Sequence, residues 1–193
     1  SLVMHYTACD FDSTMKLFTQ NIPDGRVSAH YVITQAESNG LKGGELVQVV
    51  PEAERSWHAG VSFWRGVKNL NATSIGIENV NRGFVDYETT RQWFSFDTDQ
   101  MTTLGHLSQQ IVSEHKILPQ NVVGHADIAP ARKQDPGILF PWERLYNEFG
   151  VGAWLDEEER TPHDIEKFVP NEPLPHGTSE PFFLTQLGKY GYE

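Results

Sequence analysis

Residues 74–80 read SIGIENV, and their polarity alternates along the stretch. Ile75 and Ile77 fall on one face of an extended strand, whereas Gly76 and Glu78 fall on the other, because successive side chains of a strand point to opposite sides. The stretch therefore predicts a β-strand buried on at least one face. A carboxylate on such a strand is costly unless it has a partner, which favours a function for Glu78.

Segments on both sides of this stretch show the same strand character or a helical spacing of apolar residues. Strands are predicted over residues 2–7, 29–33, 45–50 and 122–123, with glycines 40, 43 and 44 forming the loose turn of a hairpin. Helices are predicted over residues 13–20, from about 98 to 115, and over 142–149, with caps at Asp12, at Thr98 or Asp99, and at Gly150. Strands interleaved with helices predict an α/β fold, with a central mixed β-sheet flanked by helices.

The composition changes after about residue 155. Residues 156–159 read DEEE, and prolines 162, 170, 173 and 175 follow within the next twenty residues. Residues 1–155 are therefore expected to form the main domain and residues 156–180 an acidic, proline-rich linker. Residues 181–193 are expected to form a short helix that either docks on the main domain or begins a C-terminal module.

Charge and length exclude several classes of protein. Fifteen basic residues stand against twenty-six acidic ones, for a net charge of −11, so nucleic acid is not expected as a partner. No apolar run reaches the ~18–20 residues that a membrane span needs. Cys9 is the single cysteine, so it favours neither an oxidising nor a reducing compartment. The sequence opens on a strand-like run, as a processed protein also would.

Three residues have the chemistry of a catalytic zinc site. His5 lies in the first predicted strand, and His125 and Asp135 come much later in the chain. Two imidazoles and one carboxylate, with a fourth position left for water, are typical of catalytic zinc. There is no HExxH helix, so these side chains would have to converge from separate strands and loops. On spacing alone, hydrogen-bonded core histidines remain an alternative.

Motifs at six places give the chain a family resemblance. They occur in the order HYT (5–7), SAHY (28–31), WHAG (57–60), NATSIGIE (71–78), GHAD (124–127) and KQDPG (133–137). Together they resemble the zinc N-acetylmuramoyl-L-alanine amidases of type 2, which are related to the animal peptidoglycan recognition proteins. The resemblance covers about residues 2–150. Residues 150–154 and 187–192 look closest to the AmiD branch of that family, whose members are envelope enzymes with a C-terminal peptidoglycan-binding-like module.

The resemblance implies an enzyme that cuts the amide between N-acetylmuramic acid and the L-alanine of the stem peptide. It implies one zinc ion per chain, held by His5, His125 and Asp135. Glu78 matches the glutamate that takes a proton from the attacking water, and Lys133 matches the lysine that stabilises the oxyanion.

Other residues receive smaller roles. Tyr6, Trp57 and His58 are predicted substrate contacts, the last two because the WHAG loop lies near the site in the family. His30 is predicted to be a packing residue rather than a ligand. Cys9 is predicted to be a buried thiol, because relatives that use a cysteine ligand carry it at the position of Asp135.

The resemblance also implies partners and a location. Peptidoglycan or its muropeptide fragments are the expected substrate. A monomer located in the periplasm or cell envelope is expected. A lipid anchor upstream of this chain, with attachment to the outer membrane, is compatible with the resemblance. Three alternatives stay open: a non-catalytic peptidoglycan-binding protein of the same fold, a cytoplasmic recycling amidase restricted to anhydro-muropeptides, and a phage lysin.

Overall fold

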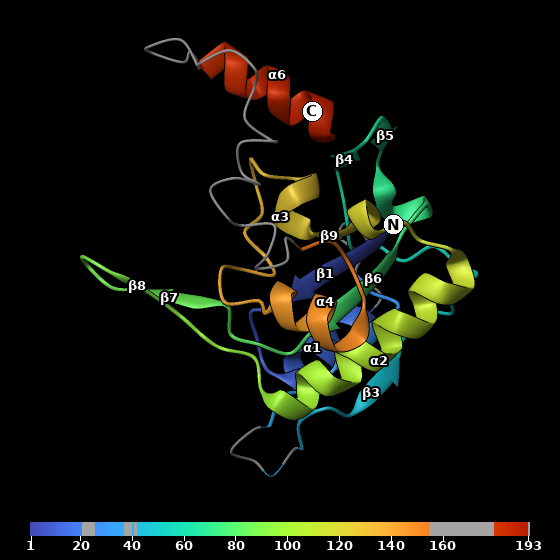
Figure 1. The fold of residues 1–193 in the computed structure, drawn as a ribbon. Coiled ribbons are helices and arrows are strands. Elements are labelled where there is room, and N and C mark those ends of the chain that lie inside the picture. Colours follow the sequence, from blue (N-terminus) through green and yellow to red (C-terminus); the bar gives the residue numbers. More distant parts are fainter. Residues whose placement is uncertain (21–25, 37–39, 41, 155–179, 193) are drawn as a thin grey trace.

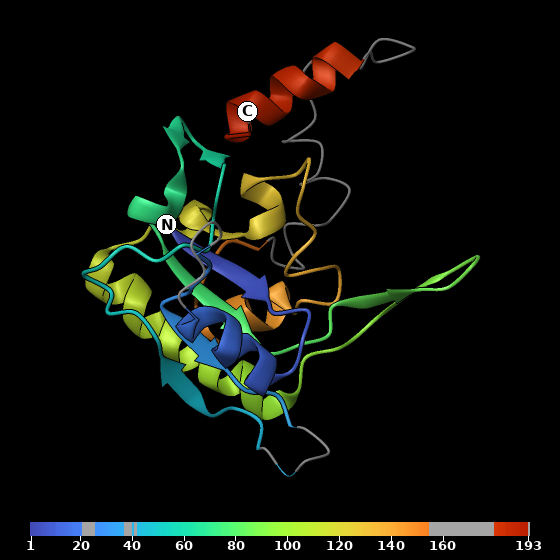
Figure 2. The same ribbon diagram turned by 180° about the vertical axis from the view of Figure 1, so that it is seen from behind.

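A five-stranded β-sheet lies at the centre of the computed structural model, which describes residues 1–20, 26–36, 40, 42–154 and 180–192 (Figures 1 and 2). The spatial order is β3-β2-β6-β1-β9. These strands are β1 (Leu2–Tyr6), β2 (Tyr31–Ile33), β3 (Leu46–Gln48), β6 (Ile75–Asn79) and β9 (Val122–Gly124). Only β3 runs antiparallel to its neighbour. The mixed sheet that the sequence predicts is thus confirmed.

The helices and smaller elements surround this sheet. The helices are α1 (Phe11–Thr19), α2 (Thr98–His115), α3 (His125–Ile128), α4 (Trp142–Phe149) and α6 (Glu180–Tyr190), with short 3-10 turns η1 (Leu70–Ala72) and η2 (Pro119–Asn121). Two small hairpins pair β4 (Phe63–Trp64) with β5 (Val67–Lys68), and β7 (Phe84–Asp86) with β8 (Arg91–Trp93). The β7–β8 hairpin projects away from the rest of the molecule (Figure 1).

One face of the sheet is apolar and is covered by α2 and α4 (Figure 1). Alternate strand residues supply it, among them Met4 and Ile77, and they form one cluster with Leu104 of α2 and Leu145 of α4. Gly105 allows the two helices to approach closely, because a Cβ there would overlap the ring of Phe149. This face forms the main hydrophobic core.

The opposite face is mixed in character. Val3 and Val123 join a smaller apolar cluster with residues of the 59–70 segment and α3. Two residues after Val3 on β1 is His5, and its register partner on the neighbouring strand β6 is Glu78. The candidate site therefore lies on the sheet face that α2 and α4 do not cover.

The predicted helices are present, but two of their caps differ from the prediction. Helix α1 begins at Phe11, and its N-cap is Asp10 rather than Asp12, because the carboxylate of Asp10 accepts the amide of Ser13. Helix α2 is capped by Asp97, which accepts the amide of Gln100. In each case an aspartate one or two residues before the predicted cap accepts an amide of the first turn. Helix α4 ends as predicted, with Gly150 in the left-handed conformation (φ 66°).

The end of the chain returns to the main body. The predicted linker, residues 156–180, lies outside the described residues except for Glu180. Helix α6 (Glu180–Tyr190) lies in the C-terminal segment for which a short helix is expected. After it, Tyr192 donates its hydroxyl to Asp127 at 2.8 Å and packs edge-on against Trp64. Within the described part of the chain, no helix is long and apolar enough to cross a membrane.

Candidate metal centre

Three adjacent parallel strands bring the candidate residues together at their carboxyl ends. His5 on β1 and Glu78 on β6 are direct register partners. His125 follows β9 immediately, and the last residue of that strand, Gly124, pairs with Met4. In open α/β sheets this edge is the usual position for a ligand.

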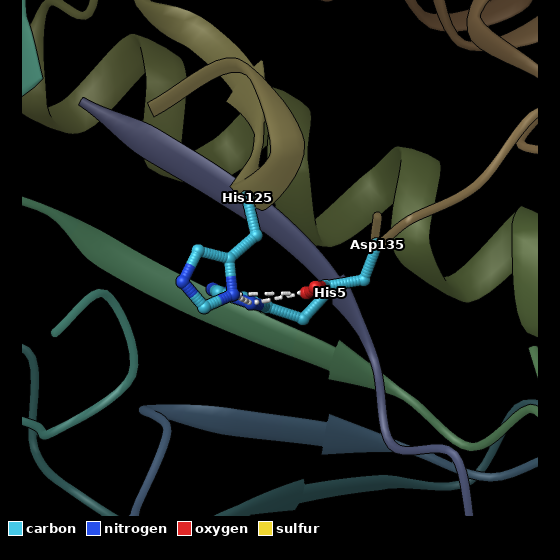
Figure 3. A group of neighbouring side chains, drawn as sticks. All are labelled: His5, His125 and Asp135. Carbon is cyan, nitrogen blue, oxygen red and sulfur yellow. Dashed lines mark hydrogen bonds and ion pairs between the residues drawn. The ribbon is translucent and has the colours of Figure 1, made fainter. Parts of the chain in front are cut away.

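Three donor atoms converge, from β1, from the first residue of α3 and from the loop that follows α3 (Figure 3). His5 Nδ1 lies 3.0 Å from His125 Nδ1 and 2.9 Å from Asp135 Oδ2, and His125 Nδ1 lies 3.0 Å from the same carboxylate oxygen. The three side chains are almost fully buried, with 1%, 3% and 7% of their surface exposed for His5, His125 and Asp135. This is the one such group of three or more His, Cys, Asp or Glu donors found among the described residues.

The protonation states suit a metal cation. Burial lowers the pKa of His5 to about 4, so its imidazole is neutral at neutral pH. Burial raises the pKa of Asp135, whereas hydrogen bonds with His125 and His5 lower it. The net effect is a pKa below the usual value, so the side chain is a carboxylate. Neutral imidazole and ionised carboxylate are the ligand forms of these residues.

The orientation of His125 also fits. Its Nε2 lies 3.1 Å from the carbonyl oxygen of Ala59, which can only accept, and 3.4 Å from Arg132 Nη2, which can only donate; the shorter contact favours a proton on Nε2. The lone pair of Nδ1 then faces the other two donors. Electron-rich atoms this close to one another need a cation or a proton between them, and two nitrogens with one oxygen suit zinc. The residues present therefore fit the metal that the sequence predicts.

The loop after α3 fixes Asp135 against His125. The amide of Ala126 donates to the backbone oxygen of Asp135 at 2.8 Å. A Cβ on Gly124 would meet the ring of Pro136 at 2.6 Å, so glycine permits this close approach. Two candidate ligands ten residues apart are thus held by backbone contacts as well as by their own side chains.

Glu78 lies beside the cluster without a hydrogen bond on one of its oxygens. Its Oε2 is buried and has no partner among the described residues. Burial and the nearby charge of Asp135 raise the pKa of Glu78 to about 8, while the charge of Lys133 acts in the opposite direction. A cation held by the three donors would lower this pKa, because it favours the carboxylate.

A cleft of about 400 Å³ opens over these residues. All the sequence-predicted site residues except His5 line it, namely Tyr6, Trp57, His58, Glu78, His125, Lys133 and Asp135. His5 lies beneath, in contact with His125 and Asp135. Two of the predicted ligands, the predicted general base Glu78 and the cationic Lys133 therefore line one cavity, with the third predicted ligand beneath it.

The predicted substrate contacts differ in accessibility. The Trp57 side chain is 38% exposed, and the guanidinium of Arg55 stacks on its ring at 3.9 Å. His58 is only 7% exposed, and both its ring nitrogens are hydrogen-bonded, to His5 and to Ser74. Trp57 thus offers an open surface to a ligand, whereas His58 does not.

Helix α1 forms an apolar wall of the cleft, which corrects one prediction. Met15, Leu17 and Phe18 are the apolar side chains of the predicted helix and would be expected to face the core, but Thr14 is the buried residue of this helix. Leu17 is 43% exposed, and it lines the cleft together with Phe18. The apolar side chains of Leu17 and Phe18 therefore face the cleft rather than the sheet.

Sequence reasoning missed the residues that hold the WHAG loop. Asn71 Oδ1 accepts the amides of Ala59 and Gly60, at 2.7 and 3.2 Å. The guanidinium of Arg132 donates to the backbone oxygens of Ala59 and Val61. Asn71 lies within a quoted motif, but a surface arginine in a loop gives no sequence signal for this role.

The two residues predicted to have packing roles have local partners. His30 Nδ1 accepts the amide of Gly76 at 3.0 Å, and the other ring nitrogen lies 3.0 Å from the carbonyl of Glu54. Cys9 is only partly buried, not buried as predicted, because it lies in the turn between β1 and α1 with exposed residues on both sides; its thiol lies 3.2 Å from the hydroxyl of Thr14. Neither belongs to the donor cluster.

A buried cluster of two histidines and one aspartate beside a further carboxylate is typical of metallohydrolases in which three protein ligands leave a position open. Residues 1–138 match the family model described as N-acetylmuramoyl-L-alanine amidase. The chain belongs to this family.

Comparison with individual relatives agrees. The chain is 41% identical to N-acetylmuramoyl-L-alanine amidase AmiD of Escherichia coli K12 over 192 residues, covering 100% of this chain and 66% of that protein. It is 36% identical to 1,6-anhydro-N-acetylmuramyl-L-alanine amidase AmpD of the same organism, over 66% of this chain and 61% of that protein. The chain thus spans slightly under two thirds of the length of these relatives.

Solved structures show the same fold. The complex of E. coli AmiD with anhydro-N-acetylmuramic acid-L-Ala-D-gamma-Glu-L-Lys superposes with a TM-score of 0.82 at 40% identity, covering 100% of this chain and 71% of that one. AmpDh3 of Pseudomonas aeruginosa in complex with anhydromuramic pentapeptide gives 0.80 at 38% identity, covering 100% and 73%.

Proposed function

We propose that this chain is a zinc-dependent amidase that hydrolyses the bond between the lactyl group of N-acetylmuramic acid and L-alanine of the stem peptide. The observation that carries the proposal is the buried triangle of His5 Nδ1, His125 Nδ1 and Asp135 Oδ2 at the edge of a cleft, in a chain of the amidase family. When bound, zinc supplies the Lewis acidity that activates water and polarises an amide carbonyl.

Glu78 is the proposed general base and acid. It is the register partner of His5, so its carboxylate lies beside the donor cluster, and its Oε2 has no competing hydrogen bond among the described residues. It would take the proton of the attacking water and pass it to the leaving nitrogen of L-alanine. Such proton transfer typically contributes ~10²–10⁴-fold to the rate.

Lys133 is the proposed stabiliser of negative charge. It lines the same cleft, and its charge acts on both His5 and Glu78. Because Lys133 precedes the proposed ligand Asp135 by two residues, the metal-binding loop itself positions its ammonium. A cation there stabilises the charge that develops on the carbonyl oxygen in the transition state.

Muropeptides are the proposed substrate class, with Tyr6 and Trp57 as contacts in the cleft. Support comes from the two matched complexes, whose ligands are anhydromuropeptides. The similarity to AmiD extends over the whole chain, whereas that to AmpD covers two thirds of it. This difference favours the cell envelope as the place of action over a cytoplasmic recycling role.

Mass spectrometry of one defined muropeptide, anhydro-N-acetylmuramyl tripeptide, tests the proposal. The expected products are anhydro-N-acetylmuramic acid with its lactyl carboxylate and a tripeptide with an unblocked L-alanine amine, and their formation should stop when zinc is removed by a chelator. Intact substrate that co-elutes with zinc-loaded protein would indicate a binding protein instead. Cleavage at another bond would also contradict the proposal.

A further inference from the structure

The ring of His58 contacts the metal cluster without belonging to it. Its Nδ1 lies 3.0 Å from His5 Nε2, and the two ring planes are nearly perpendicular, at 88°. His58 reaches this position over Gly76, where any Cβ would overlap its ring. A buried imidazole is therefore placed directly behind one of the proposed ligands.

His5, His58, Ser74 and the backbone carbonyl of Leu70 form a series of hydrogen bonds. The direction of each bond follows from the carbonyl at its end. The backbone oxygen of Leu70 lies 2.6 Å from the hydroxyl of Ser74, and a carbonyl can only accept, so Ser74 donates its one proton there. Ser74 Oγ must then accept from His58 Nε2, 3.1 Å away. With its proton on Nε2, a neutral His58 has a lone pair on Nδ1, which accepts from His5 Nε2.

This proton assignment determines which nitrogen of His5 can bind a metal together with His125 and Asp135. With its proton on Nε2, His5 presents the lone pair of Nδ1 to His125 and Asp135. The opposite tautomer would place a proton among the three donors and block a metal. His125 is set in the same way by the carbonyl of Ala59. Two consecutive residues of one loop thus supply the acceptors for both histidine ligands.

This loop is itself held in place. Asn71 accepts the amides of Ala59 and Gly60, and Arg132 binds the loop from the side of α3. The hydrogen-bond partners of a metal's histidine ligands fix their tautomer and orientation, and their loss typically costs 10–100-fold in metal affinity or activity.

We propose that His58, oriented by Ser74, is a positioning residue that holds His5 in the tautomer able to bind the metal. The inference rests on the metal site of the proposed function and replaces direct substrate contact as the role of His58. Both ring nitrogens are already engaged and the side chain is 7% exposed, so it has no donor to offer a substrate.

Zinc affinity of the full chain, measured by competition with a chromophoric chelator, tests the proposal. His58→Ala should bind zinc 10–100-fold more weakly. His58→Asn should recover most of the affinity, because its Oδ1 can accept the proton of His5 Nε2 from nearly the same position. Ser74→Ala should weaken binding by less than His58→Ala, because it frees His58 to adopt either tautomer.

His30→Ala is the matched control. His30 is a buried histidine beside the same site, its ring packs edge-on against His58, and it makes no hydrogen bond to a proposed ligand. This variant should keep the zinc affinity of the parent. Equal losses in His30→Ala and His58→Ala would reduce the role of His58 to packing and overturn the proposal, as would unchanged affinity in His58→Ala.

Nitrogen-15 NMR of the zinc-loaded protein gives an answer independent of any variant's folding. A scalar coupling between His5 Nε2 and His58 Nδ1, with the proton on His5, is expected. A proton on His58 Nδ1 would overturn the inference. Parent protein that binds no zinc would instead contradict the proposed function, so the two failures are distinguishable.

Discussion

The two faces of the central sheet are made by alternate residues of the same strands, yet they have opposite characters. Met4 and Ile77 point to the face covered by α2 and α4 and are fully buried in an apolar core. Their neighbours His5 and Glu78 point to the other face, where polar groups gather beneath a cleft. A strand of period two can thus hold a stable core on one side and a reactive site on the other.

The difference between the two faces indicates what holds the polar side chains of the site in place. His5 projects from β1 and Glu78 from β6, and the opposite sides of these two strands are anchored in the main core. Backbone positions fixed by packing can keep polar side chains in a geometry that they would not hold by themselves. Chemistry and stability should therefore respond to different substitutions.

The largest effect is expected from removing a ligand. His125→Ala should abolish both stoichiometric zinc binding and amidase activity, because catalytic zinc is normally held by three protein ligands and only two would remain. Metal analysis and turnover on one preparation check this. A variant that retains full zinc would remove His125 from the ligand set.

Glu78→Gln should separate metal binding from chemistry on the same face. Zinc content should remain at one per chain, whereas kcat should fall by ~10²–10⁴-fold, because the amide cannot take a proton from water. If zinc is lost together with activity, Glu78 is a ligand and the assigned roles are wrong.

Lys133→Met should lower kcat by roughly 10²–10³-fold with little change in KM, because the ground-state amide carries little of the charge that the ammonium stabilises. Steady-state kinetics on one muropeptide, with zinc occupancy checked, measures both constants. A raised KM with constant kcat would identify Lys133 as a partner of a substrate carboxylate.

The smallest effect on chemistry is expected from the opposite face. Leu104→Ala removes a fully buried side chain of α2 and should lower the free energy of unfolding by about 2–5 kcal/mol. Zinc affinity and kcat should hold at temperatures where the protein stays folded. Denaturant unfolding and zinc titration test the separation, and a folded variant with weakened zinc binding would break it.

The sequence predicts these two faces well, because alternation in residues 74–80 is a local property of the strand. It also predicts helix α4 and its end, because Gly150 adopts a conformation that glycine tolerates best. The hairpin β7–β8 was not predicted, since a short run such as Arg91–Trp93 lacks a clear apolar alternation.

The candidate site was predictable only in part. Motifs of the family indicated the proposed ligands and Glu78, but spacing alone could not bring residues 5, 125 and 135 together. The contacts of Ser74 with His58 and of Arg132 with the WHAG loop depend on side-chain direction in three dimensions, for which the sequence carries no periodic signal. Segments far apart in the chain meet there, so only the fold reveals them.

Anomalous diffraction at the zinc absorption edge, from crystals of the zinc-loaded protein, tests the central claim most directly. We expect one peak per chain, at about 2.0–2.2 Å from His5 Nδ1, His125 Nδ1 and Asp135 Oδ2, the usual distances for zinc bound by imidazole and carboxylate. A peak bound instead by His58 or Glu78, or a zinc ion at another place in the molecule, would contradict the account.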